Sequence, residues 1–164
     1  MNPMSNETVE TVIIGAGLSG LYAAHLLRQK RRSFAVLEAR DRVGGRILSP
    51  EYEGFFPDLG PSWYWPSIHP RTADLVRKLN LHGYRQYEEG MGCYQLFSGT
   101  VRTAPGCEMQ PLSWRLSGGM AALIRELRAG IPACALRLRH PVCRIERIRA
   151  GVRIGVGELE GEPW

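Results

Sequence analysis

The sequence predicts an α/β fold in which parallel strands alternate with helices, and three observations lead to this prediction. The apolar run at residues 12–14 has the composition of a buried strand. The glycine-rich stretch at residues 15–20 follows it and opens a segment whose apolar residues recur at helical spacing. A second apolar run, at residues 34–37, ends in the acid Glu38. Residues 8–46 are therefore predicted to form a β-α-β unit.

The glycine-rich stretch has the spacing that binds dinucleotides. Gly15 permits a tight turn, Gly17 lets the main chain approach a pyrophosphate, and Gly20 lets the helix pack closely on the strand. The first N–H groups of the helix have no partner within it, and the helix dipole adds positive charge there. Glu38 follows about 20 residues later, where a carboxylate accepts from ribose hydroxyls and repels the 2′-phosphate of NADP. A chance glycine loop in an ordinary α/β protein is the alternative.

Further elements are expected along the rest of the chain. Residues 47–56 are predicted to form a short hairpin around Ser49-Pro50, followed by a turn-rich aromatic loop at 57–66. One helix is predicted from His69-Pro70 to near Gly83, and a second after a Ser117 cap, ending at Gly130 and Pro132. Strands are predicted at residues 94–97, 135–138, 142–148 and 152–156, the last of them half-buried.

Composition indicates a globular protein. The 164 residues are enough for one domain with a hydrophobic core. They are 44% hydrophobic and 23% charged, as is typical of globular proteins. No apolar run approaches the about 20 residues of a membrane span. The first ten residues are polar and acidic, unlike a secretory signal. A cytoplasmic location without a membrane span is therefore the expectation.

The distribution of charged residues and of metal-ligating residues argues against a nucleic-acid-binding protein and against a metalloprotein. The net charge is +5, and arginines crowd the last quarter of the chain. No aromatic residue lies between Trp114 and Trp164, so no stacking platform accompanies them and nucleic acid is not an expected partner. These arginines fit a solvated strand face or a surface for an acidic partner. The four cysteines and four histidines are scattered, which predicts no metal site.

Three blocks of sequence, in order, resemble the flavin-dependent amine oxidases, which include monoamine, polyamine and L-amino-acid oxidases. The first block joins Val12–Gly20 with Glu38-Ala39-Arg40-Asp41-Arg42-Val43-Gly44-Gly45-Arg46. The second is Gly54–Trp63, which contains Asp58-Leu59-Gly60. The third is Gly118-Gly119-Met120, followed by Val142 and Ile145. The resemblance touches most of the chain.

The resemblance implies that FAD is the cofactor and assigns residues to it. The pyrophosphate would be held by the glycine-rich loop, the adenosine ribose by Glu38, and the adenine by Val142. Arg40 would lie along the adenosine, and the second glycine turn would return to the phosphates and the flavin end. The second block would lie against the isoalloxazine ring through its backbone. The predicted FAD-binding residues are Gly15, Gly17, Ser19, Gly20, Glu38, Arg40, Gly44, Gly45, Arg46, Gly60, Pro61, Ser62, Trp63 and Val142.

Three polar residues in these blocks have their own expectations. Arg46 is suited to bidentate pairing with phosphate. Arg42 is equally suited to a structural ion pair. Asp58 is expected to brace its own loop through its carboxylate rather than to act as a base.

The resemblance also fixes the predicted architecture. It is an α/β, Rossmann-like FAD-binding domain with a parallel sheet, helices and an antiparallel hairpin or meander, apparently truncated. Residues 1–86 would be the first part of this domain and 87–113 a short remnant of the substrate domain. Residues 114–164 would be its second part, incomplete at the C-terminus.

The catalytic segment of the family has no counterpart here. Family members use a lysine that reaches flavin N5 through a water, whereas Lys30 and Lys78 of this chain fall on predicted surface helices. No catalytic residue is therefore assigned. Family members that bind flavin covalently attach it in a segment absent here, so non-covalent FAD is expected.

The function implied is that of an FAD-dependent oxidoreductase of amine-oxidase type, of which this chain is the flavin-binding portion. The reaction would remove a hydride from the carbon beside the nitrogen of an amine or amino acid, and oxygen would reoxidise the flavin. The sequence leaves open whether the chain is an enzyme by itself. The alternatives are a non-catalytic FAD- or nucleotide-binding module, one half of a flavoenzyme completed by a second polypeptide or a homo-oligomer, and an inactive truncated product.

Overall fold

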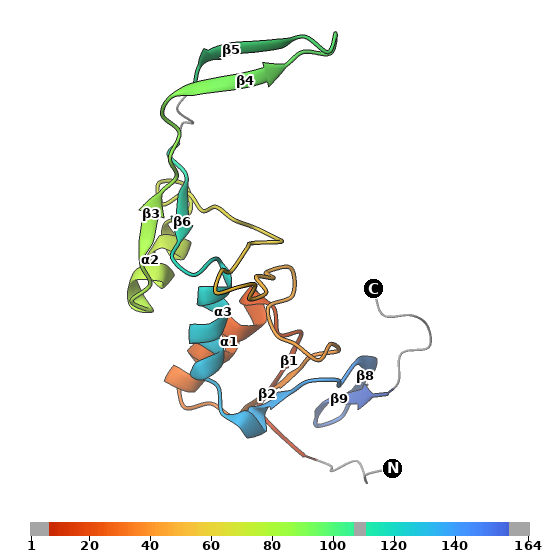
Figure 1. The fold of residues 1–164 in the computed structure, drawn as a ribbon. Helices are drawn as coiled ribbons and strands as arrows, with labels where there is room; N and C mark the ends of the chain where they lie inside the picture. Colours follow the sequence, from red (N-terminus) through yellow and green to blue (C-terminus); the bar gives the residue numbers. More distant parts are fainter. Residues whose placement is uncertain (1–6, 107–110, 158–164) are drawn as a thin grey trace. The chain divides into compact units, whose positions relative to one another are not determined.

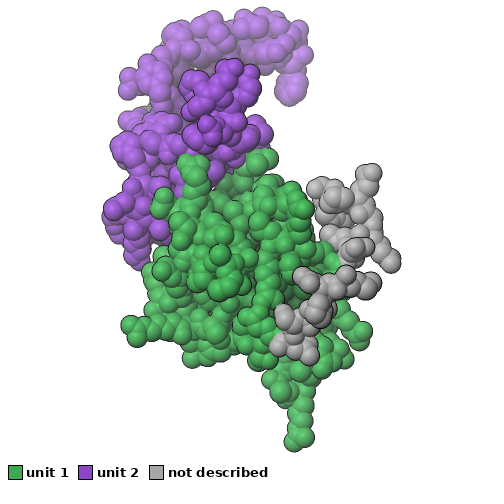
Figure 2. Space-filling model, turned by 60° about the horizontal axis from the view of Figure 1, so that its bottom comes forward, with its two compact units in different colours: residues 1–48, 123–164 green, residues 49–122 purple. Residues whose placement is uncertain are grey.

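The computed structural model describes residues 7–106 and 111–157. The chain divides into two compact units, coloured separately in Figure 2. Unit 1 comprises residues 1–48 and 123–164, and unit 2 comprises residues 49–122. The functional division predicted at residues 86 and 113 stays a prediction.

Unit 1 is built on a parallel sheet with the strand order β1-β2-β7. The first two of these strands are labelled in Figure 1. Its strands are β1 (Thr11–Ile14), β2 (Phe34–Leu37) and the two-residue β7 (Leu136–Arg137). Helix α1 (Leu18–Gln29) connects β1 to β2 and packs on both. The predicted β-α-β unit and the Rossmann-like α/β fold are confirmed.

The core of unit 1 follows from the apolar spacing of these elements. Val36 of β2 and Leu21 and Ala24 of α1 are completely buried. Helix α3 (Ala121–Ala129) contributes Leu123 and Leu127, which lie one turn apart on the same helical face and are also completely buried. Full burial of a leucine side chain stabilises the fold by about 1.5–3 kcal/mol.

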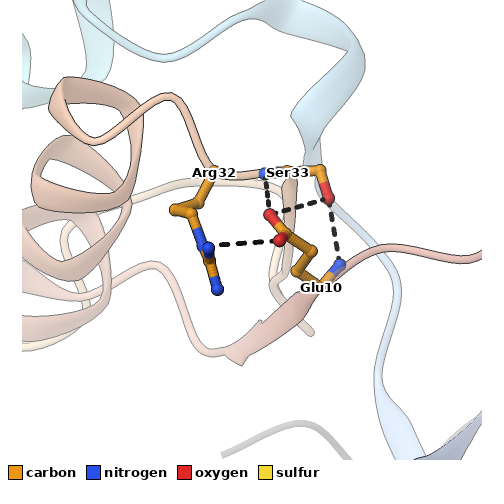
Figure 3. A network of polar contacts seen from close by, with 3 residues as sticks. All are labelled: Glu10, Arg32 and Ser33. Carbon is orange, nitrogen blue, oxygen red and sulfur yellow. Dashed lines mark hydrogen bonds and ion pairs between the residues drawn. The ribbon is translucent and has the colours of Figure 1, made fainter.

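A polar network joins the chain just before β1 to the chain just before β2 (Figure 3). The Glu10 carboxylate accepts the N–H of Ser33 at 2.8 Å and pairs with Nε of Arg32 at 3.4 Å, while the Glu10 N–H donates to Oγ of Ser33 at 3.0 Å. These groups are exposed, so the ion pair adds little stability. The network ties together the ends at which the two paired strands begin.

The basic C-terminal quarter forms an antiparallel hairpin of β8 (Val142–Ile148) and β9 (Gly151–Val156). Both predicted strands are confirmed. The predicted half-burial of β9 holds at Ile154 and Val156 but is wrong at Val152, which is 58% exposed. Ile145 of β8 is 62% exposed. The reason is that β8 and β9 form a two-stranded sheet of their own. Arg144 and Arg153 both pair with Glu146 on the exposed surface, as expected of a solvated strand face.

The described residues of unit 2 form helix α2 and two small antiparallel sheets. Helix α2 (Pro70–Lys78) ends before the predicted Gly83, because Asn80 adopts a left-handed conformation with φ 53°. Strand β3 (Gly83–Arg85) pairs with β6 (Trp114–Leu116), and β4 (Met91–Gln95) pairs with β5 (Val101–Pro105). The strand predicted at residues 94–97 therefore begins and ends earlier, and a turn at Ser98-Gly99 connects β4 to β5.

Two local predictions differ from the structure. The hairpin predicted over residues 47–56 around Ser49-Pro50 is reduced to an isolated bridge between Tyr52 and Phe55, and its turn lies at Glu53 and Gly54, which both have positive φ. The strand predicted at residues 135–138 is confirmed only as the two residues of β7, because Ala135 ends a short 3₁₀ helix, Ala133–Ala135.

Candidate nucleotide-binding site

The glycine-rich loop packs the start of α1 tightly onto β1. Gly15 has φ 95°, and its N–H donates to the carbonyl of Leu37 in β2 at 2.7 Å. A Cβ at Gly20 would lie 2.0 Å from the carbonyl oxygen of Gly15 and 3.2 Å from Cγ2 of Ile13. Gly20 is therefore required by the packing of the chain itself.

Gly17, at the N-cap of α1, is under no such constraint. Its φ of −72° and ψ of −179° suit any residue, and the nearest atom to an added Cβ is Cα of Gly45 at 4.0 Å. No side chain caps the helix here, and its first turn contains no acidic residue. The N–H of Leu21, which donates to the Gly17 carbonyl at 2.9 Å, closes the first turn. The helix N-terminus thus keeps its partial positive charge beside a position that has room for a ligand.

The second glycine turn lies directly against the first. The N–H of Gly44 donates to the carbonyl of Ala16 at 2.8 Å, and Gly17 and Gly44 form an isolated parallel bridge. A Cβ at Gly45, whose φ is 59°, would lie 3.3 Å from Cα of Gly17. The two motifs, separate in sequence, therefore form one backbone cradle, which is defined here as residues 15–20 and 44–46.

Glu38 fastens this cradle to the end of β2. It is 8% exposed, and its two carboxylate oxygens accept the N–H of Ala16 at 2.7 Å and the N–H of Arg40 at 2.9 Å. A carboxylate has about four acceptor positions, so those not used by the chain remain for a ribose hydroxyl. The ribose-binding role stays a prediction, and a structural role that the sequence did not indicate accompanies it.

Replacing Glu38 with alanine is expected to lower the free energy of unfolding by about 3 kcal/mol, since two charge-assisted hydrogen bonds are lost. The midpoint of thermal unfolding measures the change. Glu10→Ala is the matched control, because its carboxylate is exposed and its removal should cost less than about 1 kcal/mol. Equal effects of the two substitutions would refute the fastening role.

The arginines of the first block divide into two kinds. Arg42 is half-buried and donates to the carbonyls of Val43 at 3.3 Å and Gly45 at 3.1 Å. Its structural role is thus to brace the turn through carbonyls rather than through an ion pair. Arg40 and Arg46 have exposed side chains, as does Ser19. Their roles toward phosphate and adenosine stay predictions.

The start of β8 is brought to the end of β2 by the segment before it. The N–H of His140 donates to the Glu38 carbonyl at 2.8 Å, and the N–H of Arg139 donates to the Arg40 carbonyl at 2.9 Å. The predicted adenine contact, Val142, follows two residues later and is half-buried. His140 is a neighbour of the site that no sequence pattern indicated.

The other predicted cofactor residues lie in unit 2, on the loop from Gly60 to Trp63. Gly60 and Pro61 are exposed, and Oγ of Ser62 donates to the Gly60 carbonyl at 3.5 Å. Nε1 of Trp63 donates to Oε1 of Gln86 at 3.1 Å. Burial raises the pKa of the neighbouring Tyr64, which keeps its phenol neutral.

Asp58 joins the second and third sequence blocks. Its Oδ1 accepts from Oγ of Ser49 at 2.5 Å and from the N–H of Met120 at 2.9 Å, just before α3. A Cβ at Gly119 would lie 2.8 Å from the same oxygen. Asp58 is therefore a structural brace, but the prediction that it braces its own loop is wrong, since these partners lie 9 and 62 residues away. The predicted Ser117 cap is wrong, because α3 begins at Ala121 and Asp58 satisfies the preceding amide.

Asp58→Ala is expected to lower the free energy of unfolding by about 2–3 kcal/mol, because it leaves a buried amide and a hydroxyl without their acceptor. Chemical denaturation followed by circular dichroism measures the loss. The control is Asp74→Ala on α2, which removes an exposed carboxylate paired with Arg77 and Lys78 and should barely move the midpoint. A midpoint for Asp58→Ala equal to that of the control would show that the brace contributes nothing.

Within residues 7–106 and 111–157, no cluster of three or more His, Cys, Asp or Glu side chains is arranged to hold a metal ion. No helix in this part of the chain has the length and apolar character that crossing a membrane requires.

Comparison with known proteins shows which families this chain resembles. A family model described as an NAD(P)-binding Rossmann-like domain matches residues 13–79, which include the whole cradle. The chain is 43% identical over 97 residues to a putrescine oxidase from Kocuria rosea, 31% over 127 residues to the L-amino acid oxidase Lm29 from Lachesis muta, and 45% over 86 residues to a flavin-containing amine oxidase from Oncorhynchus mykiss. The resemblance to the flavin-dependent amine oxidases is confirmed.

The similarity to these amine oxidases is confined to a part of each. The three alignments cover 59%, 73% and 52% of this chain but only 20%, 24% and 16% of the relatives. The chain thus spans about a fifth of the length of the curated amine oxidases it matches.

Solved structures show the same fold. A putrescine oxidase bound to putrescine superposes with a TM-score of 0.78 at 19% identity, covering 90% of this chain and 54% of that one. Cyclohexylamine oxidase from Brevibacterium oxydans gives 0.79 at 18% identity, covering 93% and 56%.

Proposed function

We propose that this chain binds FAD non-covalently and constitutes the flavin-binding portion of an oxidoreductase of amine-oxidase type. The observation that carries the proposal is the cradle, in which two glycine turns contact each other at an uncapped helix N-terminus. The similarity to a flavin-containing amine oxidase supports flavin as the cofactor. FAD would supply the chemistry, accepting a hydride from the carbon beside an amine nitrogen and passing electrons to oxygen.

The residues present fit this cofactor. Residues 15–20 would hold the pyrophosphate through backbone N–H groups, since Gly17 leaves room for a phosphate where a side chain would sit. Glu38 would accept from the adenosine ribose while fastening the loop, and Arg46 would pair with phosphate oxygens. Val142 would meet the adenine, and the loop from Gly60 to Trp63 would lie against the isoalloxazine ring.

Substrate and partners belong to the same proposal. The substrate would be an amine or amino acid, as the names of the relatives suggest. Neither lysine is placed for catalysis, because Lys30 is exposed at the end of α1 and Lys78 pairs with Asp74 on α2. The residues that act on the substrate would thus come from a second polypeptide, from another copy of the chain or from further sequence.

A non-catalytic FAD-binding module is the second candidate function. The observation that favours it is the exposure of two apolar side chains on the β8–β9 hairpin, Ile145 and Val152, which would be available to a partner. Such a module would bind FAD as tightly but would turn over no amine unless its partner is present.

The colour of the purified chain tests FAD binding, and turnover of amines separates the enzyme from the non-catalytic module. The purified chain is expected to be yellow, with absorbance bands in the near-ultraviolet and blue, and FAD at about 100 times Kd should stabilise it by about 2.7 kcal/mol. Hydrogen peroxide formed with a panel of amines and amino acids would identify an enzyme, and its absence in a yellow protein a module. A colourless protein that FAD does not stabilise would contradict both.

A further inference from the structure

A histidine beside the end of β2 uses only one of its two ring nitrogens. His140 is half-buried, and its Nδ1 lies 2.7 Å from the carbonyl oxygen of Leu138. Because a carbonyl only accepts, Nδ1 carries the hydrogen, and Nε2 of the neutral ring is left as an acceptor. Among the residues that the structure describes, none forms a hydrogen bond with Nε2. The neutral imidazole is thus held in one tautomer with a free acceptor.

The backbone brings His140 to Glu38 through a break in the strand register. After the paired strands β2 and β7, the N–H of Glu38 donates to the carbonyl of Arg137 at 2.9 Å. In a regular parallel ladder the N–H of Arg139 would donate back to the carbonyl of Glu38. Instead the N–H of His140 donates to that carbonyl at 2.8 Å, and the N–H of Arg139 donates to the carbonyl of Arg40 at 2.9 Å. Arg139 is therefore the extra residue of a bulge.

Arg139 holds a backbone conformation that residues with side chains rarely adopt, with φ 57°. The other described non-glycine residues with positive φ follow a helix or close a turn; they are Arg31, Glu53 and Asn80. Arg139 instead lies at the carboxyl end of the parallel sheet, where folds of this kind bind ligands. Its ion pair with Asp41, at 3.5 Å, is exposed and adds little stability. Backbone strain of this kind is found at ligand-binding sites, and here it places His140 beside Glu38.

The free acceptor of His140 suits adenosine. Adenosine offers hydrogen-bond donors at its ribose hydroxyls and at the amino group of adenine. His140 adjoins both residues expected to bind these parts, since its N–H donates to the Glu38 carbonyl and Val142 follows two positions later. A role in the fold alone would require only Nδ1 and the backbone N–H, and it would leave Nε2 without a use.

We propose that His140 binds the adenosine of FAD, with Nε2 accepting a hydrogen bond from it. The identity of the ligand rests on the proposed function, whereas the position of His140 rests on hydrogen bonds within unit 1. This contact is additional to those expected of Glu38 and Val142. It also gives the bulge at Arg139 a function, because a regular strand would not place the N–H of His140 on the Glu38 carbonyl.

The test is a calorimetric titration of the full chain with FAD and with ADP, which carries the adenosine but no flavin. His140→Ala is expected to bind both about five- to tenfold more weakly, as the loss of one hydrogen bond predicts. His140→Phe keeps a ring but has no nitrogen, and its affinity should fall as much. The matched control is His25→Ala on α1, whose imidazole bonds to Gln29 at 2.9 Å, and this variant should bind as the wild type does.

A second measurement uses the wild-type chain with ¹⁵N-labelled histidine. The Nε2 resonance of His140 is expected to shift saturably as ADP is added, whereas a histidine with a structural role alone would not respond. This measurement decides the question even if His140→Ala fails to fold.

Equal affinity for ADP in His140→Ala and wild type, or an Nε2 resonance that stays in place at saturating ADP, overturns the proposal. These results, combined with FAD binding by the wild type, leave the proposed function standing. A wild-type chain that binds neither FAD nor ADP overturns the proposed function and this contact with it.

Discussion

Gly20→Ala is expected to lower the free energy of unfolding by about 3 kcal/mol, the upper end of ordinary overpacking costs. The added Cβ would lie 2.0 Å from the carbonyl oxygen of Gly15, a backbone atom that cannot rotate away. Alanine's higher helix propensity returns about 1 kcal/mol at most, so the clash dominates. For a chain of this size the midpoint of thermal unfolding should fall by about 6–12 °C.

The matched control for Gly20→Ala is the same change at Gly54, a turn glycine with φ 80° and nothing within 4 Å of an added Cβ. That substitution meets backbone strain but no clash, and it should cost about 1–2 kcal/mol. A Gly20→Ala protein as stable as the wild type would show that α1 does not pack on β1 as described.

Gly17→Ala is expected to do the opposite, leaving stability nearly intact while weakening FAD binding. The backbone at Gly17 suits alanine, and the nearest atom to the new Cβ is 4.0 Å away, so stability should change by less than about 1 kcal/mol. The methyl group would occupy the space proposed for the pyrophosphate. Loss of one or two charge-assisted hydrogen bonds at about 1.5–3 kcal/mol each corresponds to at least about a tenfold loss of affinity.

Fluorescence titration of FAD measures the affinity, and thermal unfolding of the same sample without cofactor measures the stability. Ser33→Ala, remote from the cradle in the Glu10 network, serves as the control and should leave the affinity unchanged. Unchanged FAD affinity in Gly17→Ala would place the pyrophosphate elsewhere.

The sequence predicted what local spacing determines. The β-α-β unit, the two glycine turns and the C-terminal strands follow from apolar periodicity and turn chemistry within short windows. The contact between the turns at Gly17 and Gly45 could be expected only through the resemblance, because nothing local links residues so far apart.

Long-range contacts account for what the sequence did not predict. Asp58 accepts from the amide of Met120, which lies 62 residues away in the sequence. Because no local pattern indicates this contact, the nearby Ser117 was predicted as the cap of α3. Val152 follows the alternation of a half-buried strand, but among the described residues β9 pairs with β8 alone. Alternation cannot reveal whether a second layer covers a strand. The bond from His140 to the Glu38 carbonyl likewise joins segments far apart in the sequence, and no local pattern indicates it.

Calorimetric titration of the cofactor-free chain with FAD, and separately with NADP, tests the central claim most directly. The cradle and Glu38 predict saturable binding of one FAD per chain and much weaker binding of NADP, whose 2′-phosphate would meet the Glu38 carboxylate. Absence of FAD binding, or binding of NADP at least as tight as that of FAD, would contradict the claim.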